Sequence, residues 1–289
     1  MRALRNILCL DLGGTGLKGA IVCAGKILKR VSVPTDVIHE RRGIEETFLK
    51  FLSAFSEKEY DAVALSSAGD IDSETKRVTF ATELLPGYTG FRLGEFFGRH
   101  TGKPFECLND GQAALYGECF ARGVTEQTVA MLTLGTGVGG AVVCGSFRPI
   151  EGGKLLSLGH LPLVKGGRAC TCGKRGCIEQ YVSGSALTGA LSNSGIKCSQ
   201  EELWKRYDEG DKRVRDVVGK WLNYLHKACD SVYERYPFDL MILGGGVSNS
   251  GKSWFADFEK SDRYAVELSV LGNDAGILGA YAFFTRRGL

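Results

Sequence analysis

One segment of the sequence occurs twice. Residues 10–25 read Leu-Asp-Leu-Gly-Gly-Thr-Gly-Leu-Lys-Gly-Ala-Ile-Val-Cys-Ala-Gly, and residues 132–145 read Leu-Thr-Leu-Gly-Thr-Gly-Val-Gly-Gly-Ala-Val-Val-Cys-Gly. One gap aligns the copies. Each consists of an apolar run, a glycine turn with a threonine, a second apolar run and a further glycine, which is the pattern of a β-hairpin. Because the copies lie about 120 residues apart, the duplication predicts two related domains.

The sequence between and after the two copies alternates between strand and helix patterns. We expect strands over 61–67, 105–108 and 240–243, and helices over 112–122, from about 201 to 236, and from about 274. This alternation predicts an α/β fold. We expect an N-terminal lobe of residues 1–112 and a C-terminal lobe of residues 113–289, with the last helix, 274–289, packing back on the first lobe.

Charge and hydropathy exclude several classes of protein. Lys and Arg number 36 and Asp and Glu number 33, so the net charge of +3 is too small to indicate nucleic acid as the main partner. No stretch approaches the roughly 18 to 20 apolar residues of a membrane helix. Asp11 interrupts the apolar run of residues 1–14, so we do not expect a signal peptide there. Seven of the ten cysteines stand singly in apolar or helical text, as reduced thiols do, and we expect a cytoplasmic protein without nucleic-acid or membrane partners.

The first glycine turn matches a dinucleotide-binding pattern. Residues 14–19 fit G-x-G-x-x-G, and Asp36 lies roughly where a ribose-binding acid would fall. That motif requires a helix after the glycines, whereas residues 17–22 and 27–33 are strand-like around a Gly25-Lys26 turn. A nicotinamide-dependent oxidoreductase therefore rests on the glycine match alone. The turn is either a phosphate-binding loop, whose backbone N–H groups approach an anion closely, or simply a tight hairpin turn.

A second cluster of residues predicts a metal site. His160 is followed by Cys170, Cys172 and Cys177, in a C-x-C-x4-C arrangement among polar residues. Three thiolates and an imidazole suit tetrahedral zinc, and four protein ligands leave no open position, which favours a structural role. A disulfide, or three unrelated buried cysteines, are the alternatives.

Together these motifs resemble a known family. Two hairpins, the first carrying Asp11, resemble the sugar kinase, actin and Hsp70 superfold. The zinc segment from Gly159 to Glu179 resembles the signature of the ROK family (repressor, open reading frame, kinase). The resemblance covers essentially the whole chain, and the other motifs occur in order at residues 85–88, 109–110, 134–137, 244–247 and 273–276. The family's repressors carry an additional N-terminal helix-turn-helix, and the first hairpin begins within ten residues of Met1, so we expect a kinase.

The resemblance implies a two-lobed, ribonuclease H-like fold with a cleft between the lobes, a homodimer, and ATP-dependent phosphorylation of a hexose, at the 6-hydroxyl in a glucokinase-type reaction. Asp110 would be the catalytic base and Asp11 would position Mg²⁺ through water. Zn²⁺ would be structural. The implied sugar contacts are Gly69, Asp70, Asn109, Ser157, His160 and Glu179. The implied ATP and magnesium contacts are Asp11, Gly13, Gly14, Thr15, Lys18, Gly135, Thr136, Gly137, Gly244, Gly245 and Gly246.

Simpler interpretations exist for several of these residues. Asp11 could cap a turn, Asn109-Asp110 could cap the following helix, and Gly69-Asp70 could be a plain loop turn. Two positions also depart from the family pattern: Ser157 stands where many members have glutamate, and Glu83-Leu84 stands where many have asparagine. The acceptor therefore stays open between glucose, N-acetylmannosamine and a β-glucoside, and a non-catalytic sugar sensor is the alternative of another class.

Overall fold

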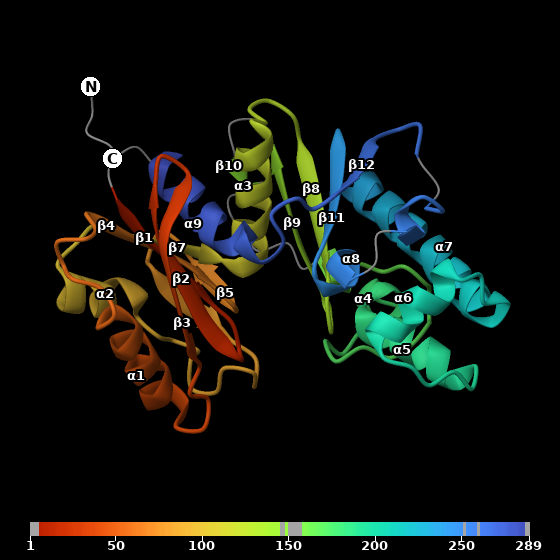
Figure 1. Cartoon of the computed structure of the whole chain (residues 1–289), viewed down its shortest axis with the longest axis horizontal. Coiled ribbons are helices and arrows are strands. Elements are labelled where there is room, and N and C mark those ends of the chain that lie inside the picture. The colour runs from red at the N-terminus through yellow and green to blue at the C-terminus, as the bar shows by residue number, and fades with distance from the viewer. Residues whose placement is uncertain (1–5, 145–147, 150–157, 251–252, 259–260, 287–289) are drawn as a thin grey trace. The chain divides into compact units, whose positions relative to one another are not determined.

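A computed structural model describes residues 6–144, 148–149, 158–250, 253–258 and 261–286. The chain forms two compact units, of which the first joins Met1–Val124 to Asn273–Leu289 and the second is Thr125–Gly272 (Figure 1). The first unit is therefore discontinuous in sequence. Its last helix comes from the end of the chain, after the whole of the second unit.

The first unit is built on a five-stranded sheet in the order β3-β2-β1-β4-β7. The strands are β1 (Ile7–Leu12), β2 (Gly16–Cys23), β3 (Lys26–Pro34), β4 (Ala62–Ser67) and β7 (Phe105–Asn109). β1 runs antiparallel to β2 and parallel to β4. Leu12 pairs with Leu17, so the first glycine segment is a hairpin turn between β1 and β2, as the sequence predicts.

One face of this sheet packs on α1 (Glu40–Leu52) and α2 (Leu93–Thr101). Alternate residues of β1, Leu8, Leu10 and Leu12, share an apolar core with Phe48 and Phe51 of α1. This period of two is what a pleated strand imposes. A small hairpin of β5 (Asp70–Asp72) and β6 (Arg77–Phe80) extends from the same unit.

The other face of the sheet carries α3 (Asp110–Arg122) and α9 (Ala275–Arg286), which lie side by side (Figure 1). Glycines allow a very close approach between the two helices. A Cβ atom at Gly279 would lie 1.7 Å from the carbonyl oxygen of Ala113, and one at Gly117 would lie 2.4 Å from that of Ala275. The expected boundary after residue 112 lies inside α3, whereas the units separate after Val124 because α3 packs as a whole on α9 and the sheet.

The second unit repeats this architecture. Its sheet has the order β10-β9-β8-β11-β12, with β8 antiparallel to β9 and parallel to β11. The strands are β8 (Val129–Leu134), β9 (Val138–Cys144), β10 (Arg148–Pro149), β11 (Leu240–Gly244) and β12 (Ala265–Leu268). The helices are α4 (Glu179–Val182), α5 (Gly184–Asn193), α6 (Gln200–Asp208), α7 (Lys212–Arg235) and α8 (Gly246–Ser250), with short 3-10 turns at Leu158–His160 and Ser253–Phe255. A third 3-10 turn, Gly272–Asp274, leads from the second unit back into α9 of the first.

The segment from 201 to 236, expected to be helical, forms two helices. Gly210 has a φ of 85°, which ends α6, and the Asp211 side chain accepts hydrogen bonds from the N–H groups of Arg213 and Val214 at the start of α7. Gly210 thus ends α6, and Asp211 is the N-cap of α7. α7 has 24 residues, but neither it nor another helix of the described chain is long and apolar enough to cross a bilayer.

Candidate active site and metal centre

Asp11 lies at the end of β1, just before the first glycine turn. Its Oδ1 accepts a hydrogen bond of 2.6 Å from the Ser66 hydroxyl on the neighbouring strand. Burial raises the pKa of the Asp11 carboxyl, while Ser66 and the nearby Lys18 lower it. The backbone at Gly276 closes over the group, because a Cβ there would lie 2.6 Å from the carboxyl carbon. Asp11 is thus held by side chains and backbone rather than free in a loop.

The glycine turn itself is tight and partly open to solvent. The N–H of Gly13 donates to the carbonyl of Gly16 at 2.9 Å, and Thr15 at the tip is exposed. Thr35 supports the turn from the end of β3, since its hydroxyl donates to the Gly13 carbonyl at 2.8 Å. Lys18 is exposed on β2, opposite Asp11 in the strand pairing.

Asp110 is the first residue of α3 and follows β7 directly. Its carboxyl group is open to solvent yet has protein atoms on most sides. This desolvation raises its pKa to about 6, and the charge of Asp11 adds to the increase, against hydrogen bonds from the Gly111 N–H and the Asn109 amide. A carboxylate with a pKa near 6 is a better proton acceptor than an ordinary aspartate and is still mostly ionised at pH 7.

Asn109, and not Asp110, caps the helix. Its Oδ1 accepts from the N–H groups of Gly111 and Gln112 at 2.9 and 3.2 Å, and its Nδ2 donates to the Gly69 carbonyl and to Asp110 Oδ1 at 2.8 and 2.9 Å. The side chain is buried, with 6% of its surface exposed. Asn109 therefore fixes Asp110 and the Gly69 loop, and both N–H bonds of its amide are used within the protein.

The Gly69 loop brings Asp70 to the same end of the sheet. Asp70 is half-buried at the start of β5, and burial raises the pKa of its carboxyl. Within the described residues the Asp70 carboxylate has no hydrogen-bond donor. Partial burial without a partner is typical of a carboxylate that binds a ligand.

The second glycine turn joins β8 to β9 and resembles the first. The N–H of Gly135 donates to the carbonyl of Gly137 at 3.0 Å, and Thr136 is exposed at the tip. Glu179, at the start of α4, accepts a hydrogen bond of 3.0 Å from the Val138 N–H. A Cβ at Gly137 would lie 2.5 Å from the same carboxylate, so glycine is needed for Glu179 to approach the turn.

The third glycine segment follows β11. Gly244 ends that strand, and Gly245 has a φ of 90° against the backbone of Leu134. Gly246 begins α8, and a Cβ there would meet no atom within 4 Å. The segment thus has open space beside it.

His160, Cys170, Cys172 and Cys177 form one cluster, with their candidate ligand atoms all within 4.8 Å of one another. Cys170 Sγ lies 3.6 Å from His160 Nδ1, and Cys172 Sγ lies 3.6 Å from Cys177 Sγ. The edge of a tetrahedron around zinc with Zn–S bonds of about 2.3 Å is about 3.8 Å, so the four side chains fit that ion. No described cysteine is in a disulfide. Burial raises the pKa of Cys170, but hydrogen bonds from Cys172, Cys177 and Gln180 outweigh it and lower the pKa to about 7.

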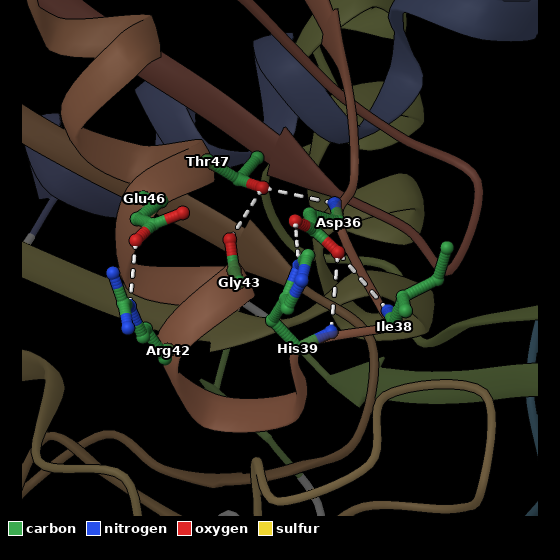
Figure 2. Close-up of polar contacts among 7 residues, drawn as sticks. All are labelled: Asp36, Ile38, His39, Arg42, Gly43, Glu46 and Thr47. Carbon is green, nitrogen blue, oxygen red and sulfur yellow. Dashed lines mark hydrogen bonds and ion pairs between the residues drawn. The ribbon is translucent and has the colours of Figure 1, made fainter.

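Asp36, the acid of the dinucleotide interpretation, has another role. Its Oδ1 accepts from the N–H groups of Ile38 and His39, and its Oδ2 lies 2.7 Å from His39 Nδ1 (Figure 2). These bonds from His39 lower the pKa of Asp36. The carboxylate organises the turn into α1, and a strand, not a helix, follows the glycines. Both features argue against a nicotinamide site.

The sequence analysis did not identify the residues that support Asp11 and the first glycine turn. Ser66 and Thr35 contact Asp11 or the first glycine turn from two other elements, and only the register of β1 with β4 could have signalled Ser66. Gly276 belongs to the motif at residues 273–276, but its contact with Asp11 was not expected. Ser157, the expected sugar contact that departs from the family pattern, lies outside the described residues.

The two five-stranded sheets have the same arrangement of strands, and each has a glycine turn after its first strand. This is the sugar kinase, actin and Hsp70 superfold, so the expected fold class is confirmed. Within that class the chain belongs to the ROK family, whose model matches residues 7–287.

Named relatives of this chain are sugar kinases. It is 28% identical over 285 residues to an N-acetylmannosamine kinase of Haemophilus influenzae, covering 94% of this chain and 93% of that protein. It is 30% identical over 314 residues to a glucokinase of Thermotoga maritima, covering 98% of each. The solved structure of a ROK family glucokinase from Streptomyces griseus, in complex with glucose and AMPPNP, is 26% identical. It superposes with a TM-score of 0.77 over 98% of this chain and 100% of that chain.

Proposed function

We propose that this protein transfers the γ-phosphoryl group of ATP to the 6-hydroxyl of a hexose or hexose derivative. The observation that carries the proposal is Asp110, an accessible carboxylate with a pKa raised to about 6 at the head of a helix. The relatives of this chain, which are named as sugar kinases, support the phosphorylation of a sugar.

Asp110 acts as the general base. It accepts the proton of the sugar hydroxyl while the bond from that oxygen to the γ-phosphorus forms and the bond from phosphorus to the ADP oxygen breaks. Asn109 holds Asp110 in place by a hydrogen bond to Oδ1, and Asp70 is the free carboxylate that binds a sugar hydroxyl. His160 contributes its Nε2 and Glu179 its remaining oxygen to the sugar, and the backbone of Gly69 lies beside it.

The glycine turns bind the nucleotide. The backbone of Gly13, Gly14 and Thr15, with Lys18, binds phosphate oxygens, because glycine leaves no side chain in the way. Gly135, Thr136 and Gly137 provide the second phosphate contact, and Gly244, Gly245 and Gly246 accommodate the adenosine.

Two metal ions fit the residues present. Asp11, an oxygen donor desolvated by burial, would hold Mg²⁺, which neutralises phosphate charge. His160, Cys170, Cys172 and Cys177 would hold Zn²⁺, which keeps the segment before α4, and therefore Glu179, in position.

The acceptor is proposed to be glucose, with N-acetylmannosamine and β-glucosides as alternatives that the names of the relatives leave open. The test is release of ADP from ATP with glucose, N-acetylmannosamine, mannose and methyl β-glucoside as acceptors. We expect turnover with at least one of them. Sugar binding without ADP release would refute the kinase and support a sugar sensor.

Asp110→Asn tests the base directly. The amide keeps the size of the side chain and its acceptor for Gly111 but cannot take the proton, so we expect turnover to fall at least about 100-fold with sugar binding retained. Asp61→Asn is the matched control, because Asp61 precedes β4 at the end of the strand opposite to Ser66. Equal turnover of the two variants would remove Asp110 from the mechanism.

A further inference from the structure

A hollow lined by arginines lies on the first unit, and none of the residues assigned to the kinase reaction lines it. It has a volume of about 190 Å³. Its lining includes Arg41 and Glu45 of α1, and Arg92, Phe96 and Arg99 at the start and along α2. All these residues belong to one compact unit, so the site is complete within it.

The guanidinium group of Arg41 is fixed in this hollow. Its Nε donates to the carbonyl of Gly87 at 3.2 Å and its Nη2 to that of Thr89 at 3.0 Å. The group also lies over the ring of Phe91, 5.8 Å from its centroid. A guanidinium has five N–H donors, so Arg41 keeps donors for a ligand in a position already set by the protein.

A second guanidinium converges on the same place. The point where a Cβ of Gly90 would lie is 3.8 Å from Arg41 Nη2 and 3.5 Å from Arg77 Nη2. Gly90 has a φ of 80°, a conformation that favours glycine, and the missing side chain leaves this space open between two positive groups. The geometry is that of a pair of donors facing one acceptor.

The positive charges of the hollow are incompletely balanced. Arg92 pairs with Glu95 at 2.9 Å, but among the described residues no hydrogen bond or ion pair reaches the side chains of Arg77 or Arg99. Like charges held close together repel each other, and a bound dianion removes that repulsion. Guanidinium groups bind phosphate through paired N–H donors, so phosphate is the anion that this hollow fits best.

The remaining lining indicates what the phosphate is attached to. Glu45 is half-buried in the hollow and has no hydrogen-bond partner in the described part of the chain, so its carboxylate can accept from a hydroxyl group. Phe96 adds an apolar wall. We propose that this hollow is a binding site for a small phosphorylated sugar, with the phosphate between Arg41, Arg77 and Arg99 and a sugar hydroxyl on Glu45.

Calorimetric titration of the full chain tests the site, with ribose 5-phosphate, inorganic phosphate and ribose as probes. We expect ribose 5-phosphate to bind at least tenfold more tightly than inorganic phosphate, and ribose not to bind. Arg77→Ala and Arg99→Ala should each weaken ribose 5-phosphate binding about tenfold or more, since each removes a charged hydrogen-bond donor. Glu45→Gln should weaken the sugar phosphate but not inorganic phosphate.

Arg42→Ala is the matched control. Arg42 follows Arg41 on α1, but its Nε donates to Glu46 at 2.8 Å (Figure 2) and it does not line the hollow, while the substitution changes the net charge equally. We expect this variant to bind ribose 5-phosphate as the wild type does. Equal affinity of Arg42→Ala, Arg77→Ala and Arg99→Ala would place the anion elsewhere and overturn the proposal. So would the absence of saturable binding up to about 10 mM, or equal affinity for inorganic phosphate and ribose 5-phosphate.

Discussion

Replacement of Gly279 by alanine is expected to destabilise the first unit through the contact between α9 and α3. The new Cβ would lie 1.7 Å from the carbonyl oxygen of Ala113 and 2.4 Å from its carbonyl carbon, where ordinary contact begins at 3.4 Å. The atoms it meets are backbone atoms, which cannot rotate away, so the helices must separate by more than an ångström.

The magnitude follows from two opposing effects. Overpacking of a close contact costs about 1–3 kcal/mol, and a clash with rigid backbone belongs at the upper end of that range. Alanine is a better helix former than glycine by about 1 kcal/mol, which offsets part of the loss. We therefore expect Gly279→Ala to lower the free energy of unfolding by about 2 kcal/mol.

Gly98→Ala is the matched control. Gly98 lies within α2 of the same unit, and a Cβ there meets no atom within 4 Å. With helix propensity gained and no clash, this variant should be more stable than the wild type by about 0.5–1 kcal/mol. The two substitutions are chemically identical and differ only in what surrounds the new methyl group.

Urea unfolding followed by circular dichroism measures both variants. With a slope of about 2 kcal/mol per molar urea, Gly279→Ala should lower the midpoint by about 1 M. Tryptophan fluorescence separates the units, because the three tryptophans, Trp204, Trp221 and Trp254, all lie in the second. A midpoint for Gly279→Ala equal to or above that of the wild type would refute the close packing of α3 on α9.

Three further outcomes are expected. The kcat/KM of the proposed kinase should fall about tenfold per pH unit below pH 6, because the pKa of Asp110 is raised to about 6 and only the ionised carboxylate accepts a proton. A kcat/KM that stays constant down to about pH 4 would contradict this. Elemental analysis should find about one zinc per chain, lost in Cys172→Ser together with thermal stability but retained in Cys198→Ser, whose thiol lies outside the cluster. Ser157→Glu should increase the kcat/KM for glucose relative to the kcat/KM for methyl glucoside. An unchanged ratio of the two values would exclude a role of residue 157 in specificity.

Local patterns in the sequence predicted the parts of the molecule that depend on neighbouring residues. The glycines of both turns restrict the chain to hairpins, and the structure contains both of them. The four candidate zinc ligands lie within 18 residues, from His160 to Cys177, so closeness in sequence already implies closeness in space.

Features that depend on distant residues could not be predicted in this way. Asn109 and Asp110 are both good helix caps, and the choice depends on where β7 ends: Asn109 is still extended, with φ and ψ of −65° and 149°, so Asp110 becomes the first helical residue. The arginine hollow is lined by residues 41, 92 and 99, and Arg77 approaches it at Gly90; these arginines share no motif. The division after Val124 depends on α3 packing against a helix that begins 150 residues later.

The order of the two units along the chain has a consequence during synthesis on the ribosome. Residues 125–272 are continuous and can fold as soon as they emerge, whereas the first unit lacks α9 until residues 275–286 are made. At about 5–20 residues per second, the first 124 residues wait roughly 10 to 30 s for their final helix. During that time the face of the nascent sheet that α9 later covers is exposed, and Asp11 lacks the backbone of Gly276 beside it. The first unit's part of the candidate active site therefore forms only after α9 has been made, and this interval is when the nascent first unit is most exposed to misfolding and to chaperones.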